Sequence, residues 1–151
     1  MRKSNIYTQG NRRKINSNWF TGNTYMKDIS GTIQSKEQDI YHVYFKSGSK
    51  TKLHSHNGSQ ILIIIQGKGK LEFFKKSGNK KEDFKIKRTE SIQLNPGDIA
   101  YIPKGILHTH GSSSKNLFSH IAINILPSKK TPFKTAWYES DFKTRTTALI
   151  H

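Results

Sequence analysis

The chain has 151 residues, contains no cysteine and carries a formal net charge of +16. This length fits one domain with a single core. The lack of cysteine excludes a disulfide framework, a thiolate metal site and a cysteine nucleophile. Only 32% of the residues are hydrophobic, but they gather in runs such as 61–65 and 121–126. This favours a compact core under a strongly solvated surface rather than disorder.

The 26 lysines and arginines are spread along the whole chain. Such a basic balance can mark a protein that binds nucleic acid or an anionic surface. Because most of the charge is lysine at loop-like or exposed-strand positions, we interpret it as a solvated surface. Nucleic-acid binding through the basic hairpin with Lys80, Lys81 and Lys85 is the least favoured alternative.

No apolar segment is long enough to span a bilayer, so we expect no membrane partner. Arg2 and Lys3 precede no apolar stretch, so no secretory signal is predicted. We therefore expect a cytoplasmic protein.

Residues 1–18 are polar, basic and without periodicity, and predict an N-terminal arm that is either mobile or laid across another part of the chain. After the apolar anchor Trp19–Gly22, a short strand is predicted at Tyr25–Ile29. Gln38–Phe45 is rich in β-branched and aromatic residues and predicts a longer strand.

The stretch Gly48–Gly67 contains two histidines one residue apart. His54 and His56 share a face if the segment is extended, because side chains alternate along a strand. Asn57-Gly58 tolerates positive φ, so we predict that the chain reverses there in a hairpin. Gln60 would then open the next strand close to both imidazoles, and three donors from one hairpin are the beginning of a metal site.

Further short strands are expected between Gly and Pro turns. They cover residues 68–75, 84–87, 90–94, 99–102, 108–111 and 118–126. Lys75–Arg88 should form a protruding hairpin, and the tail 127–151 is expected to hold one short helical turn around Trp137–Phe142. This succession predicts an all-β sandwich or barrel.

Two motifs stand out in this series. The first is Gly48-x5-His54-x-His56-x3-Gln60-x6-Gly67, and the second is Gly97-x5-Pro103-x-Gly105-x2-His108. In order, spacing and residue type they resemble the two motifs of the cupin superfamily. The resemblance implies a double-stranded β-helix, a jelly-roll-like antiparallel barrel over residues 19–126, with a metal at its centre. The implied ligands are His54, His56, Gln60 and His108.

Trp19–Gly22, His108-Thr-His110-Gly111 and His120-Ile-Ala-Ile-Asn124 look like the small bacterial cupins that include manganese-dependent hydroxynitrile lyases. That resemblance implies Mn²⁺ as the cofactor, acid–base roles for His110 and His120, and a homodimer. It also implies a substrate pocket formed by Tyr41, Val43 and Asn124, with Tyr41 bulkier than its counterpart in those lyases. His42 should face away from the pocket and be structural.

Three neutral imidazoles and an amide leave a divalent ion its full charge, which favours Lewis-acid chemistry. Fe²⁺, Co²⁺, Ni²⁺ and Zn²⁺ suit the same donors. The expected function is a metal-dependent reaction on a small hydroxylated or carbonyl substrate, such as cyanohydrin cleavage or synthesis. A cupin-type dioxygenase is an alternative. So is a non-catalytic small-molecule-binding or sensor cupin, which would hold His110 and His120 away from any cavity.

Overall fold

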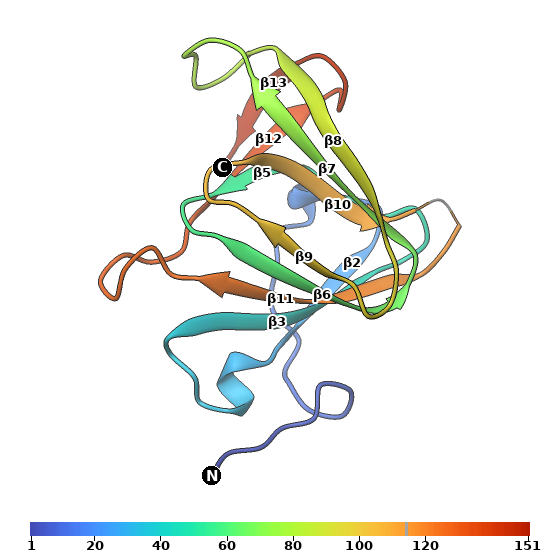
Figure 1. Cartoon of the computed structure of the whole chain (residues 1–151), viewed down its shortest axis with the longest axis vertical. Coiled ribbons are helices and arrows are strands. Elements are labelled where there is room, and N and C mark those ends of the chain that lie inside the picture. The colour runs from blue at the N-terminus through green and yellow to red at the C-terminus, as the bar shows by residue number, and fades with distance from the viewer. Residues whose placement is uncertain (114) are drawn as a thin grey trace.

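A computed structural model describes residues 1–113 and 115–151 as two antiparallel β-sheets wrapped around a common interior (Figure 1). Apart from short 3-10 helices at Ser17–Trp19 and Ser30–Thr32, the described residues form strands and loops. No helix among them is long and apolar enough to cross a bilayer. The predicted all-β fold is confirmed.

The larger sheet has eight strands in the order β1-β4-β10-β5-β12-β13, with β7 paired to β10 and β8 paired to β7. Its strands are β1 (Phe20–Thr21), β4 (Lys50–Thr51), β5 (Leu53–His56), β7 (Gly69–Lys76), β8 (Ile86–Leu94), β10 (Leu107–Ser112), β12 (Thr135–Ser140) and β13 (Thr146–Ile150). The smaller sheet has the order β2-β3-β11-β6-β9. Its strands are β2 (Thr24–Asp28), β3 (Gln38–Phe45), β6 (Gln60–Gly67), β9 (Ile99–Ile102) and β11 (Phe118–Ile125).

The core lies between the inner faces of the two sheets. Along β6, Leu62 and Ile64 are almost fully buried while Ile61 and Ile63 point outward and are half-buried. This alternation is the period of a strand with one face on a core. The inward residues pack with Phe45 and other buried side chains from both sheets, so the apolar interior holds the strands that carry the polar site.

The expected hairpin at Asn57-Gly58 is wrong. β5 belongs to the eight-stranded sheet and β6 to the five-stranded sheet, so the chain crosses between sheets at this point. Neither residue has positive φ. Gly58 is required instead by a close approach, because a Cβ there would lie 2.2 Å from the carbonyl oxygen of Ile125.

The helical turn expected around Trp137–Phe142 is also wrong, because β12 covers most of this segment. β12 pairs with β5, placing Thr135 opposite His56 and Trp137 opposite His54. The ladder to β5 and a second ladder to β13 satisfy the backbone groups of β12, so an extended conformation is favoured over a local helix. The tail therefore contributes two strands to the sheet that carries the histidines.

The N-terminal arm and the long insertion both pack against the rest of the chain. The arm is laid across β2, where the Arg13 amide donates to the Met26 carbonyl. β7 and β8 form the predicted hairpin, although residues 84–94 give one strand, β8, rather than two. The loop between them is tied to β13, because the Phe84 amide donates to the Thr146 hydroxyl.

Candidate metal and active site

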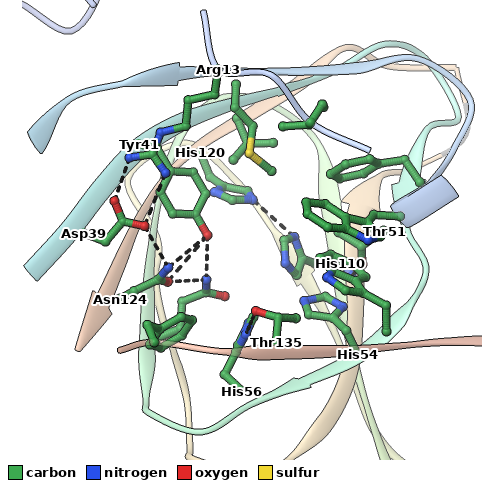
Figure 2. A pocket seen from close by; sticks show the side chains of 18 of the residues that line it. Arg13, Asp39, Tyr41, Thr51, His54, His56, His110, His120, Asn124 and Thr135 are labelled. Carbon is green, nitrogen blue, oxygen red and sulfur yellow. Dashed lines mark hydrogen bonds and ion pairs between the residues drawn. The ribbon is translucent and has the colours of Figure 1, made fainter. Parts of the chain in front are cut away.

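A cavity of about 340 Å³ lies between the two sheets, with polar groups at its base and aromatic side chains around it (Figure 2). The polar lining includes His54, His56, Gln60, His110, His120 and Asn124. His108 is fully buried, with its ring centroid 4.0 Å from that of His54. The two pairs of histidines and the glutamine singled out by the motifs therefore meet in one place.

His54 and His108 are oriented by their own strands. Their Nδ1 atoms lie 2.9 Å from the Lys52 carbonyl oxygen and 2.8 Å from the Ile106 carbonyl oxygen, each two residues earlier. Because a carbonyl oxygen only accepts, each Nδ1 must carry the proton. The opposite nitrogen, Nε2, then keeps its lone pair for a ligand, as in metal-binding histidines.

His56 and Gln60 are oriented by side chains from other elements. Nδ1 of His56 lies 2.8 Å from the Thr135 hydroxyl on β12. The Gln60 amide donates from Nε2 to Asn124 Oδ1 (2.7 Å) and to the Tyr41 hydroxyl (3.1 Å). These contacts leave His56 Nε2 and Gln60 Oε1 as the free ends of their side chains.

Buried polar atoms without a hydrogen-bond partner are rare in folded proteins, so each requires an explanation. Within the described part of the chain, His56 Nε2, Gln60 Oε1 and His108 Nε2 are buried and have no hydrogen-bond partner. Together with Nε2 of His54 they form a set of three imidazole nitrogens and one amide oxygen. This set fits a divalent transition metal.

His110 also lies close to two members of this set. The ligand nitrogens of His54, His108 and His110 all lie within 4.8 Å of one another. His110 Nδ1 is in addition 3.1 Å from His120 Nε2. The prediction assigned His110 to proton transfer, and the structure places it where it can contact both a metal and His120.

Burial lowers the pKa of every histidine in the cavity. It lowers the pKa of His56 and of His120 to about 3, and that of His108 to about 4. For His54 and His110, burial and the neighbouring imidazoles together hold the pKa well below its ordinary value. All five are thus neutral near pH 7, the state required of a metal ligand or a proton acceptor.

Tyr41, Val43 and Asn124 line the cavity as expected of the predicted substrate pocket. Tyr41 and Asn124 are also engaged with the protein, because both bond to Gln60. Burial raises the pKa of Tyr41 to about 12, which keeps its hydroxyl protonated. His42 faces away, as predicted, with Nε2 3.1 Å from the Ser119 hydroxyl.

Several cavity residues were not identified from the sequence. Arg13 and Asp39 lie at one side of the cavity, and Thr135 and Trp137 at another. Trp137 stacks on His54 with ring centroids 4.3 Å apart. The only signal in the tail was the alternation of Thr135 and Trp137, which places both on one face of a strand.

The chain has relatives among known proteins. The chain is 25% identical over 107 residues to an (R)-mandelonitrile lyase from Granulicella tundricola, covering 71% of this chain and 72% of the relative. A cupin-like protein from Thermotoga maritima superposes with a TM-score of 0.63 at 29% identity, over 91% of this chain and 90% of the other.

The polyketide cyclase RemF from Streptomyces resistomycificus shares the fold alone, with a TM-score of 0.65 at 13% identity over 93% of this chain and 89% of the other. The sequence profile of the cupin family matches residues 36–144, which is well over half of the chain. The chain belongs to the cupin family.

Proposed function

We propose that this protein is a metal-dependent enzyme that acts on a small hydroxylated or carbonyl substrate, and specifically that it cleaves and forms cyanohydrins. The observation that carries the proposal is the His110–His120 pair, hydrogen-bonded at 3.1 Å in a cavity beside three buried donor atoms that have no hydrogen-bond partner, His56 Nε2, Gln60 Oε1 and His108 Nε2. The 25% identity to a mandelonitrile lyase supports the choice of reaction.

His54, His56, Gln60 and His108 would hold the ion, with Mn²⁺ the first expectation and Fe²⁺, Co²⁺, Ni²⁺ or Zn²⁺ the alternatives. When bound, it would supply Lewis acidity that makes a nearby hydroxyl more acidic. All four donors are neutral, so none of the ion's charge is cancelled by the protein. His54 and His108 keep their Nε2 lone pairs directed away from their own strands because carbonyl oxygens hold Nδ1.

The proton chemistry falls to His110 and His120. One imidazole of the pair accepts the proton of the cyanohydrin hydroxyl. The C–O bond becomes a C=O bond as the C–CN bond breaks, and cyanide leaves with the bonding electron pair. Return of the proton to cyanide gives an aldehyde and hydrogen cyanide, so every atom and charge of the cyanohydrin is accounted for.

The aromatic lining suits the aldehyde part of such a substrate. Trp19, Trp137 and Phe133 line the cavity. Trp19 and Trp137 stack on each other with their planes 4° apart, and Trp137 also stacks on His54. The pair is therefore a rigid apolar part of the cavity wall, against which an aryl group can pack. The cavity histidines are at most 6% exposed, and this burial limits loss of the proton to solvent.

The test is release of benzaldehyde from mandelonitrile by the purified Mn²⁺-loaded protein. His110→Ala should lower kcat by roughly 10²–10⁴-fold, the usual contribution of a positioned acid–base group. His42→Gln, at a buried histidine outside the cavity, is the matched control and should keep the activity. A metal-loaded protein without turnover, together with a His110→Ala variant that behaves as the parent in every assay, would overturn the proposal.

A dioxygenase would use the same donors with Fe²⁺, and oxygen consumption with a candidate substrate separates the two reactions. A purely binding or sensor cupin is disfavoured by geometry. His110 and His120 line the cavity and bond to each other, rather than lying away from it.

A further inference from the structure

The side-chain amide of Gln60 could bind a metal ion in only one of its two orientations, because only its oxygen can act as a ligand. Rotated by half a turn, its amide would present two N–H donors to the imidazoles instead of an oxygen. A cation can be bound only by the oxygen. In the structure Gln60 Nε2 is directed at Asn124 and Tyr41, and Oε1 has no hydrogen-bond partner.

The orientation of Gln60 is set by a directional chain of hydrogen bonds. The carboxylate of Asp39 can only accept, so the Asn124 amide must turn its nitrogen toward Asp39 (3.3 Å). This turn directs Asn124 Oδ1 at Gln60, where it accepts from Nε2 at 2.7 Å. The Asp39 carboxylate thus fixes the orientation of the Asn124 amide, and the Asn124 amide fixes the orientation of the Gln60 amide, so that Gln60 Oε1 is left for a metal.

Asp39 is in turn held by the N-terminal arm. Arg13 donates to both Asp39 oxygens, at 2.6 and 3.2 Å, and to Asp28 at 2.5 Å. Its guanidinium also lies 4.7 Å from the centre of the Tyr41 ring. A bidentate pair of this kind fixes a carboxylate in both position and rotation.

We propose that Asp39 is a positioning residue for the metal ligand Gln60, that it acts through Asn124, and that Arg13 couples the N-terminal arm to the metal site. The inference rests on the proposed role of Gln60 as a ligand, but not on any particular reaction. Outer residues that orient a ligand typically change metal affinity by about 10–100-fold.

The test measures binding of Mn²⁺ by calorimetry and the visible absorption of the Co²⁺-loaded protein, without any substrate. Asp39→Asn has the same shape but can donate as well as accept, so affinity should fall by about 10–100-fold and the Co²⁺ spectrum should shift. Asp28→Asn is the matched control. It removes the other carboxylate of Arg13, touches neither amide, and should leave affinity and spectrum unchanged.

The exchange Asp39→Asn with Asn124→Asp restores the direction of the chain, because residue 39 then donates and residue 124 accepts from Gln60. It should recover most of the lost affinity, which a variant that merely unfolds cannot do. Equal affinities and spectra for the parent and Asp39→Asn would overturn the inference. A parent that binds no divalent ion would refute the proposed function and this inference together. Metal binding without cyanohydrin turnover would refute only the reaction.

Discussion

The two walls of the cavity are built on different principles. The histidine wall, which consists of His54, His56, His108 and His110 on β5 and β10, presents imidazole nitrogens. The amide wall, which consists of Tyr41, Gln60 and Asn124 on β3, β6 and β11, pairs its polar groups with one another and leaves one oxygen free. The first wall supplies most of the donors, and the second controls how its single donor is presented.

The origin of each orientation differs as well. Two imidazoles of the histidine wall are held by carbonyl oxygens two residues away in the chain. The amide wall is held by contacts between residues far apart in the chain, such as the hydrogen bond from Asn124 to Asp39, residues that are 85 positions apart. Local contacts form with the strand itself, whereas the amide wall depends on correct docking of β3, β6 and β11.

The largest expected effect is the loss of Mn²⁺ affinity on removal of a ligand, which distinguishes the ligand His56 from the acid–base residue His110 within the histidine wall. His56→Ala should lose far more Mn²⁺ affinity than the roughly 10–100-fold of an outer residue, because it removes a donor atom. His110→Ala should retain metal to within a few-fold and lose catalysis. Elemental analysis of both purified variants decides this, and the opposite pattern would mean that His54, His108 and His110 form the metal site.

The pH dependence of stability tests the neutral state of the histidine wall. His56 and His108 take up protons near pH 6.5 in the unfolded chain but only near pH 3 and 4 in the fold. Between these values the unfolded chain binds more protons. Stability of the metal-free protein should therefore be full above pH 6.5 and fall below it, by about 1.4 kcal/mol per pH unit for each such histidine.

Melting temperatures of the metal-free protein between pH 8 and pH 5 measure this effect. His42, whose pKa burial lowers to about 4, adds to the loss from outside the cavity. His42→Gln should therefore reduce the slope without removing it. A melting temperature that stays constant as the pH falls from 7 to 5 would contradict the buried, neutral wall.

A smaller effect is expected where the tail supports the histidine wall. Thr135→Val keeps the shape but removes the hydroxyl that holds His56 Nδ1 at 2.8 Å. Mn²⁺ affinity should fall by about 10–100-fold, measured by calorimetry. Thr147→Val, at an exposed position on β13, is the control, and equal affinities for the two variants would show that β12 does not orient the ligand.

The smallest effect is expected from the amide wall. Tyr41→Phe removes one of the two acceptors of the Gln60 amide, but Asn124 Oδ1 remains at 2.7 Å. Loss of a single neutral hydrogen bond corresponds to about 0.5–1.5 kcal/mol, so metal affinity should fall by about tenfold or less. A larger loss would mean that the hydroxyl, rather than Asn124, fixes the orientation of Gln60.

Much of the fold was predictable because the pattern of the strands is local. The boundaries expected for β3 and β9 coincide with those observed, since each is a run of β-branched and aromatic residues between turn signals. The failures concern partners. The sequence Asn57-Gly58 is equally compatible with a hairpin and with a crossover between sheets. The segment Thr135–Ser140 forms the strand β12 because it pairs with the edge of β5.

The same division applies to the site. The sequence by itself determined which residues could serve as metal ligands, because the spacing of His54, His56, Gln60 and His108 is visible in two motifs. Strand periodicity also predicts that His54 and His56 share a face. Only the tertiary structure decided what orients His56 and Gln60, since His54 and His108 are held by carbonyl oxygens two residues away. Thr135, Trp137, Asp39 and Arg13 reach the cavity from the tail, from β3 and from the arm. Side-chain hydrogen bonds between residues far apart in the chain leave no periodic trace in the sequence, so the ligands could be predicted while their supports could not.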